Sequence, residues 1–447
     1  MAGRVGIAVA VPRVGPPPVE RFSLPNGLSV VLAPIPKSPT VSVWVWYRVG
    51  SKNEWPGVTG ASHWVEHMLF QGSPRYGKGE IDRAIVEVGG TLNAFTDTDF
   101  TAYFSTVPRE HLSIPLDIES DRMTRATIAP SEVERERTVI RSEREGNENW
   151  PEFRVDEQIY ALAYQRHPYR WDPLGYPDDI LALTPADLAG YYHRFYGTRN
   201  ATLVVSGGFD PANVAPEVRR RFSRLPLSGE DPTVRVVEPP QRGARSATLS
   251  GPGTTPFLDA AWRAPSVSDP LAPAAILLDV VLGGETRLFA PGSAWSRSPE
   301  HPSSRLYRRL VDPGLAVQAG SSWRPRVHPG LFSVHAQAAR GVALETLEAA
   351  VLDEVDRLAR DGPTAAELRE ARTKIVAGAA LAYEGASKRG FRLGYFAMFG
   401  PPGSESDLLR RVLAVSPRSV RTAAAAILTP DQRTVVRYEP TGATPAA

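Results

Sequence analysis

The chain has 447 residues, which is too long for one ordinary hydrophobic core and predicts two or more domains. Its 51 basic and 49 acidic residues nearly balance, so its charge gives no case for nucleic acid or an anionic membrane as a partner. It contains no cysteine, which excludes disulfides, thiolate metal ligands and a cysteine nucleophile. Any metal must therefore be held by His, Asp or Glu.

Residues 1–18 are expected to form a flexible leader. They end in three prolines, and their mostly apolar run from Val5 to Val11 lies at the lower limit for a secretory signal, without a convincing cleavage site. No apolar run approaches the roughly 20 residues that a membrane-spanning helix requires. We therefore expect a soluble protein without membrane contact, most simply in a bacterial cytoplasm, with the periplasm and an organelle as alternatives.

The first structured segments have the patterns of strands. Alternating residues on both sides of Pro25-Asn26-Gly27 predict a β-hairpin within Phe22 to Leu32. Thr40 to Val49 is rich in valine and tryptophan, which predicts a further strand. A sheet is thus expected to begin before the first helix.

The next segment contains the most informative motif of the chain, His63-Trp64-Val65-Glu66-His67. Thr59 to Phe70 is predicted to be helical, so the two histidines lie on one face, one turn apart, and can share one metal ion. Glu66 can reach a metal-bound water without occupying a coordination position. This His-x-x-Glu-His order is typical of a zinc hydrolase. Two surface histidines on an amphipathic helix are the alternative, which is disfavoured because the chain has only eight histidines.

The segments after the motif predict further strands and helices. Glu80 to Val88 has an apolar face at helical spacing. Thr91 to Thr96 and Phe100 to Val107 predict a second hairpin. A long helical region is expected from His111 to about Asn147, with an interruption near Pro130.

A catalytic zinc site needs three protein ligands and an open position, so the two histidines require a third His, Asp or Glu. The helix predicted after residue 130 presents Glu132, Glu136 and Glu143 on nearly one face. Arginines interleave with these acids, so a solvated charged face is an equally good interpretation from spacing alone. The remaining histidines make a weaker case.

Two domains are predicted from the distribution of proline, glycine and charge. Residues 226–245 are rich in all three and are expected to be a linker between an N-terminal domain, residues 19–225, and a C-terminal domain, residues 246–441. The second half repeats the first at an offset of 235 residues. The identical positions are Leu112/Leu347, Asp121-Arg122/Asp356-Arg357, Glu132/Glu367, Arg137-Thr138/Arg372-Thr373 and Ile140/Ile375. Two copies of one α+β unit are the simplest account, with coincidence between unrelated helices as the alternative.

The metal-binding residue types belong to the first copy alone. At the same offset Glu136 falls on Ala371 and Glu143 on Gly378. The segment opposite the histidine motif, Ser298 to Pro302, has a single histidine. The acids are therefore interpreted as additions to a shared scaffold, and the C-terminal domain is expected to lack a metal site.

Several landmarks resemble the pitrilysin-type zinc peptidases, in the branch of smaller subunits that includes mitochondrial processing peptidase and paired bacterial proteases. The resemblance runs from about Val19 to Pro440. It is carried by the residues 60–70, Gly89-Gly90-Thr91-Leu92-Asn93-Ala94-Phe95-Thr96, Glu134-Arg135-Glu136-Arg137 and His167-Pro168-Tyr169. The resemblance implies an α+β fold of two homologous α/β-sandwich domains. Each would be a mostly antiparallel sheet packed with helices, and together they would form half of a clam-shell.

The same resemblance implies a zinc metallopeptidase that hydrolyses short or unfolded peptides in an enclosed chamber. It implies one Zn²⁺ per chain, with His63, His67 and Glu143 as ligands and Glu136 as a supporting carboxylate. Glu66 would be the general base that takes the proton of the metal-bound water and returns it to the leaving amine.

The resemblance also implies a place for the peptide. The strand around Asn93, Ala94 and Phe95 would pair with an extended peptide as an added strand. This mode reads the backbone first, so it suits unfolded or short peptides.

One departure from the family concerns the second domain. Active relatives place an Arg and a Tyr there, seven residues apart, facing the zinc. In this chain Leu310 and Val317 occupy those positions, with Arg309 one residue away. A chain of this length also supplies only half of the chamber. We therefore predict a heterodimer with a homologous subunit that lacks the metal motif and carries the Arg and Tyr, with a homodimer as the alternative.

Residues 285–304 form an insertion relative to the family, which is expected to be a surface loop, with chamber closure or partner contact as the alternative. Two other functions remain open for this fold: a non-catalytic structural subunit of a larger complex, and a peptide-binding module that retains metal. The intact His63, Glu66 and His67 argue against the structural subunit, which needs none of them.

Overall fold

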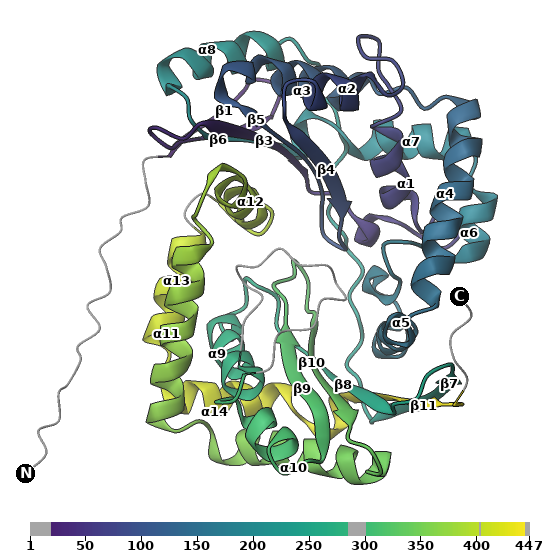
Figure 1. Cartoon of the computed structure of the whole chain (residues 1–447), viewed down its shortest axis with the longest axis vertical. Coiled ribbons are helices and arrows are strands. Elements are labelled where there is room, and N and C mark those ends of the chain that lie inside the picture. Colours follow the sequence, from purple (N-terminus) through teal and green to yellow (C-terminus); the bar gives the residue numbers. More distant parts are fainter. Residues whose placement is uncertain (1–18, 285–300, 402–403, 443–447) are drawn as a thin grey trace, which may run out of the picture.

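The computed structural model describes residues 19–284, 301–401 and 404–442. The predicted leader, residues 1–18, and residues 285–300 of the predicted insertion lie outside these ranges. Within them the chain forms two halves, each built on one β-sheet with helices (Figure 1). No helix in these ranges combines the length and the apolar character that crossing a bilayer requires.

The first half contains a six-stranded sheet in the order β1-β2-β6-β3-β5-β4. Parallel pairing occurs between β2 and β6, and the other neighbours are antiparallel. Both predicted hairpins, β1-β2 and β4-β5, are confirmed. The strands are β1 (Glu20–Ser23), β2 (Ser29–Pro34), β3 (Thr40–Tyr47), β4 (Thr91–Thr96), β5 (Thr101–Pro108) and β6 (Ala201–Gly207).

The second half repeats this topology without a counterpart of β1. Its order is β7-β11-β8-β10-β9, with β7 parallel to β11 and the other neighbours antiparallel. The strands are β7 (Arg245–Gly251), β8 (Phe257–Arg263), β9 (Ala316–Trp323), β10 (Leu331–Ala338) and β11 (Arg433–Pro440). Two mostly antiparallel sheets of the same order confirm the predicted α+β class and the internal duplication.

Most helices cover the outer face of the sheet in their own half, and the two main hydrophobic cores lie between those layers (Figure 1). The first half has α1 (Ala61–Met68), α2 (Glu80–Val86), α3 (Ser113–Arg125), α4 (Pro130–Glu148), α6 (Pro177–Ala182), α7 (Pro185–Phe195) and α8 (Pro211–Phe222). The second half has α9 (Ala272–Gly283), α10 (Leu344–Asp361), α11 (Ala365–Leu381), α13 (Ser404–Ala414) and α14 (Pro417–Ile427). The predicted break near Pro130 is confirmed, because Pro130 is the first residue of α4, where its missing N–H costs no helical hydrogen bond.

Two helices cover the sheet of the opposite half. α12 (Ala386–Ala397), from the second half, packs on β2, β3 and β6, while α5 (Pro151–Ala163), from the first half, packs on β7, β8 and β11 (Figure 1). Gly394 lets α12 approach the first sheet closely, since a Cβ there would lie 1.9 Å from Trp46 Nε1. Each half therefore needs the other to complete its packing.

The duplication corrects one sequence-based expectation. Each of α1 and α9 is the first α-helix after the strand at the centre of its sheet, so α9 is the counterpart of the motif helix. The expectation that Ser298 to Pro302 lies opposite the motif is wrong, because the extra residues between α9 and β9 change the spacing. α9 contains neither His nor Glu, and its Asp279 accepts hydrogen bonds from Ser321 and the Trp323 N–H.

Candidate metal centre

The motif helix α1 is shorter than predicted, and a buried carboxylate fixes its start. Gly60 precedes it with φ +87°, a left-handed conformation that glycine adopts without strain. Glu54 accepts hydrogen bonds from the backbone N–H groups of Gly60, at 2.9 Å, and Ser62, at 2.8 Å. Burial nevertheless raises the pKa of Glu54 to about 8. This cap was not predicted, because nothing in the local pattern distinguishes Glu54 from an ordinary loop acid.

The two motif histidines and Glu143 of α4 converge on one point. Glu143 Oε2 lies 3.6 Å from the Nε2 atom of His63 and 3.6 Å from that of His67. Ligand atoms of a tetrahedral zinc site with bonds of about 2.0–2.1 Å stand about 3.3 Å apart. Across the described ranges, these three residues are the one group of His, Cys, Asp or Glu with the spacing of a metal site. Two imidazoles and a carboxylate are a usual zinc ligand set, so the donor chemistry and the spacing both fit Zn²⁺.

Burial and neighbouring charges shift the pKa values of all three groups. Burial, together with the charge of His67, lowers the pKa of His63 to about 4. Burial alone would also lower the pKa of His67, but the hydrogen bond with Glu136 and the nearby carboxylates of Glu143 and Glu66 raise it to about 9. The nearby imidazoles of His67 and His63 keep the pKa of Glu143 below its usual value. A proton on His67 and a metal ion would therefore compete for the same imidazole.

Glu136 holds the outer side of His67. Its Oε2 atom lies 3.0 Å from His67 Nδ1, and its Oε1 atom accepts a 2.8 Å hydrogen bond from Gln71. A carboxylate on Nδ1 fixes the ring orientation, with Nε2 directed to Glu143. Gln71 was not predicted, although it lies four residues after His67 and hence near it along the chain. Glu132, the third acid of the predicted face, pairs instead with Lys78 and Arg135.

Glu66 lies beside the ligand group and is not part of it. Its side chain is buried, and its Oε2 atom accepts a 2.7 Å hydrogen bond from the hydroxyl of Thr96 on β4. Burial raises the pKa of Glu66 to about 7, against the opposing effects of Thr96 and His67. Such a carboxyl can accept and return a proton near neutral pH. Thr96 was also not predicted, because 30 residues separate it from Glu66.

The residues predicted to bind substrate lie on β4, which is the edge strand of the first sheet opposite β1. Asn93 is exposed, and its side chain accepts a hydrogen bond from the Ala94 N–H. Phe95 points into an aromatic cluster and packs edge-on against Trp46, with ring centroids 5.6 Å apart. The strand edge next to Glu66 thus has the position that an added peptide strand would need.

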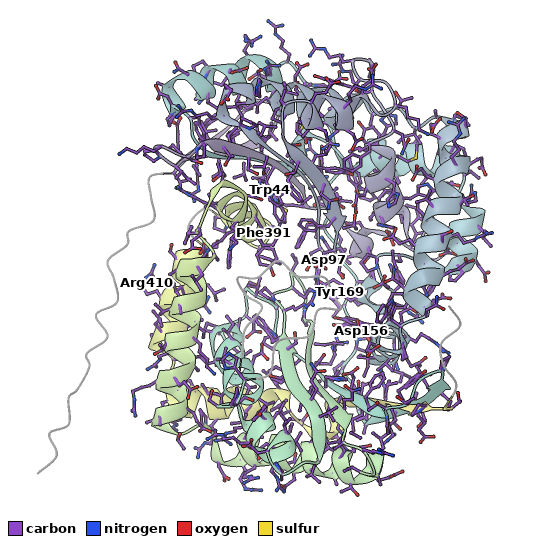
Figure 2. The ribbon with its side chains drawn as sticks, viewed as in Figure 1. Trp44, Asp97, Asp156, Tyr169, Phe391 and Arg410 are labelled. Carbon is purple, nitrogen blue, oxygen red and sulfur yellow. The ribbon has the colours of Figure 1, made fainter. Side chains whose placement is uncertain are left out.

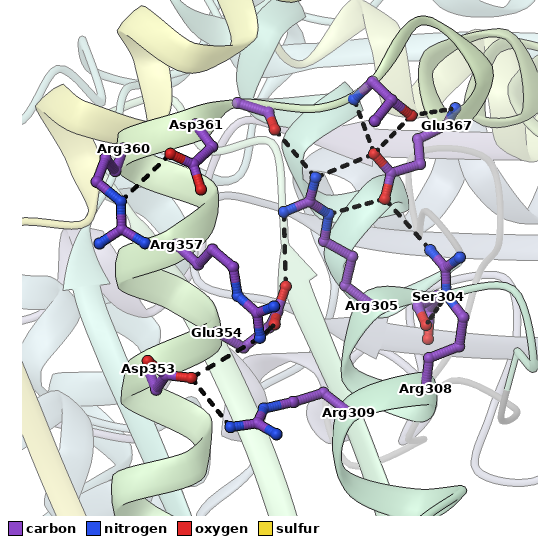
Figure 3. A network of polar contacts seen from close by, with 12 residues as sticks. Ser304, Arg305, Arg308, Arg309, Asp353, Glu354, Arg357, Arg360, Asp361 and Glu367 are labelled. Carbon is purple, nitrogen blue, oxygen red and sulfur yellow. Dashed lines mark hydrogen bonds and ion pairs between the residues drawn. The ribbon is translucent and has the colours of Figure 1, made fainter.

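The second half places no Arg or Tyr at the two positions discussed above. Leu310 is buried in the core of the second half, and Val317 on β9 is 50% exposed. The guanidinium of Arg309 is 3.1 Å from Asp353 of α10, within a network of arginines and acids that includes Glu354 and Glu367 (Figure 3). Arg309 is therefore paired with an acid of its own half.

Comparisons with known proteins agree with this geometry. The family model described as Insulinase (Peptidase family M16) matches residues 29–175, and the model described as Peptidase M16 inactive domain matches residues 182–375. A zinc protease of Helicobacter pylori, PqqE, is 30% identical over 358 residues, covering 79% of this chain and 77% of that protein. A probable mitochondrial-processing peptidase subunit beta of Arabidopsis thaliana is 26% identical, covering 91% of this chain and 76% of that protein.

The fold gives the same result as the sequence comparisons. The crystal structure of a protease from Helicobacter pylori superposes with a TM-score of 0.87 at 26% identity, covering 95% of this chain and 100% of that chain. The predicted resemblance to the pitrilysin-type peptidases is thereby confirmed. With its duplicated sheets and its His-x-x-Glu-His motif, the chain belongs to the insulinase family of peptidases, M16.

Proposed function

We propose that this protein is a zinc metallopeptidase subunit that hydrolyses peptide bonds of short or unfolded peptides. The observation that carries the proposal is the position of Glu143, 3.6 Å from both motif imidazoles. Glu66 stands next to this ligand group and is not needed as a ligand, so it can act as a base. The names of the relatives support the proposal, because the Helicobacter pylori protein is a zinc protease.

In this proposal His63, His67 and Glu143 hold one Zn²⁺, and Glu136 keeps His67 in its ligating orientation. Zinc bound there would supply a Lewis acid that acidifies a water molecule and polarises the scissile carbonyl. Glu66 removes a proton from the attacking water and delivers it to the nitrogen of the leaving amine. Both of its tasks use one carboxyl group, which must be fixed close to the ligands.

The peptide is proposed to bind as an added strand along β4, with Asn93, Ala94 and Phe95 as the residues alongside it. Backbone pairing at a sheet edge requires an extended peptide, so folded substrates would be excluded. This mode is supported by the position of β4 at the edge of its sheet and by the contact between Thr96 of β4 and Glu66.

A partner subunit is proposed to complete the active site. Leu310 and Val317 supply neither the cation nor the phenol, and Arg309 is paired with Asp353. We propose a heterodimer with a homologous chain that carries the Arg and the Tyr, and a homodimer is the alternative. The Arabidopsis relative is itself described as a subunit, which is consistent with assembly.

Metal analysis combined with peptide hydrolysis tests the function. Zinc content and cleavage of a quenched peptide would be measured for the wild type and Glu66→Gln, each purified alone and in complex with its natural partner. Glu145→Gln, an exposed acid on α4 paired with Arg141, is the control. We expect one zinc per chain in all three proteins, and hydrolysis by the complex that only Glu66→Gln abolishes.

The other outcomes discriminate between the alternatives. Bound zinc without hydrolysis in either preparation would contradict the peptidase and favour a peptide-binding module, whereas absence of zinc would favour a structural subunit. Full hydrolysis by a monomer purified alone would contradict the need for a partner.

A further inference from the structure

The hydroxyl of Thr96 has a defined acceptor. It donates to Glu66 Oε2 at 2.7 Å, while its other hydroxyl neighbour, Thr101, lies at 3.3 Å and sits 2.9 Å from the Val49 carbonyl, to which it donates. The hydrogen bond between Thr96 and the Glu66 carboxylate is thus the shorter and the charge-assisted one. Thr96 ends β4, so the orientation of Glu66 depends on where this strand ends.

The turn that follows Thr96 is held from both halves of the chain, and in the first half Lys52 pairs with Asp99 at 3.6 Å. Asp97 accepts a hydrogen bond from the buried guanidinium of Arg326, and Asp99 accepts one from the Val327 N–H at 3.1 Å. The Tyr169 hydroxyl also donates to Asp99, at 2.7 Å. Figure 2 places Asp97 and Tyr169 between the two sheets. The turn therefore connects the catalytic half with the loop between β9 and β10.

We propose that Thr96 is a positioning residue for Glu66, and that the second half keeps Thr96 in place through the pair formed by Arg326 and Asp97. This inference rests on the proposed peptidase function. One carboxylate oxygen of Glu66 is occupied by the Thr96 hydroxyl, which leaves the other to accept the proton of the attacking water. The second half thus contributes to catalysis in the same chain, because it helps to position Glu66.

A comparison of two ion pairs supports this role. Arg326 is 8% exposed and crosses from one half to the other. The pair of Arg309 and Asp353 joins elements of the second half and is half exposed. Removing the partner of a buried charge is strongly destabilising, whereas an exposed pair contributes little. Arg309 is therefore a matched control for Arg326.

Substitutions of Thr96 test the first part of the proposal. In the partner complex, Thr96→Val is expected to lower kcat about tenfold or more, since a hydrogen bond to a charged group is lost. KM and zinc content should stay at the wild-type values, and Thr96→Ser should restore most of kcat. A Thr96→Val enzyme with kcat within about twofold of the wild type would overturn the proposal, as would a Thr96→Ser enzyme as slow as Thr96→Val.

Substitutions at the Arg326–Asp97 pair test whether the second half keeps Thr96 in place. Arg326→Gln is expected to lower kcat, while Arg309→Gln leaves it unchanged. The double variant Arg326→Gln/Thr96→Val should have the same kcat as Thr96→Val alone, because both changes remove the restraint on the Glu66 carboxylate. Fully additive losses would contradict the connection through Asp97. If Arg326→Gln does not fold, as judged by melting temperature, Asp97→Asn replaces it with the same expectation.

Glu66→Gln in the same assay separates this inference from the proposed function. An inactive wild-type complex would refute both. An active wild type with an inactive Glu66→Gln and a normal Thr96→Val would refute the role of Thr96 alone.

Discussion

The two halves of this molecule share a sheet topology, apart from β1, and differ in the side chains of two corresponding pairs of helices. α1 carries two imidazoles and a carboxylate, whereas all twelve residues of α9 are buried and it offers neither His nor Glu. The next pair differs in the same way, because α4 carries Glu136 and Glu143 where α11 has Ala371 and Gly378 at the offset of 235 residues. A handful of side chains thus distinguishes a half that contains a candidate metal site from a half in which the corresponding helix is packed in the core.

The largest effect is expected when the proposed ligand Glu143 is removed, because the first half would then lack a complete set of metal ligands, as the second half does. Glu143→Gln is expected to remove zinc and to lower hydrolysis about 100-fold or more, because two histidines alone leave the ion weakly held. Zinc per chain after dialysis and kcat/KM are the measurements. Glu145→Gln, two residues further on α4, should retain both, and a Glu143→Gln protein with full zinc would assign the third ligand elsewhere.

A smaller effect is expected when Glu136 is replaced by the residue of its counterpart. Glu136→Ala leaves the three ligands intact but frees His67 Nδ1, so zinc affinity should fall about 10-fold to 100-fold. Competition with a chelator would measure this affinity. Glu132→Ala, on the same helix but paired with Lys78, is the control and should bind zinc as the wild type does.

The packing of α12 on the first sheet can be tested by measuring thermal stability. Gly394→Ala would place a Cβ against Trp46 and should destabilise the protein by about 1–3 kcal/mol, which lowers Tm by several degrees. Gly190→Ala, inside α7, places its Cβ within 4 Å of nothing beyond its chain neighbours and the backbone of its own helix, and it should be neutral or stabilising. Equal Tm values for the two variants would contradict close packing of α12 on the first sheet.

The last effect is expected from Asp156 on α5, and it depends on pH. Burial, together with the charges of Asp259 and Asp172, raises its folded-state pKa to about 7, against about 4 in the unfolded chain. Between these values the folded state retains a proton that the unfolded state has lost, so stability falls as pH rises through this window. Asp156→Asn should therefore raise Tm at pH 8 more than at pH 5. The same Tm difference at both pH values would count against this explanation.

The sequence predicted those features that depend on neighbouring residues. The hairpin at Pro25-Asn26-Gly27, the break at Pro130 and the shared face of His63 and His67 follow from turn chemistry, proline and helical spacing. Spacing alone left the acids of α4 equally well explained as a solvated face, and it was the resemblance to the pitrilysin-type peptidases that singled out Glu143 as the proposed third ligand.

Features that arise from contacts between distant segments had no such signal. Thr96 meets α1 only through the fold, and Glu54, although it precedes Gly60 by only six residues, has the local surroundings of any polar residue. The counterpart of α1 was misplaced because one offset does not hold across residues 285–304. The local sequence of α12 does not indicate which sheet it packs on.

The exchange of α5 and α12 has a consequence for building chimaeras. A cut between β6 and β7 separates the halves along the chain, yet the helix fitted to Trp44 and Trp46 remains with the other piece. Transplanting a second half from a relative would import an α12 shaped for a different sheet. A working hybrid should therefore take α12 from the same source as β2, β3 and β6, and α5 from the same source as β7, β8 and β11.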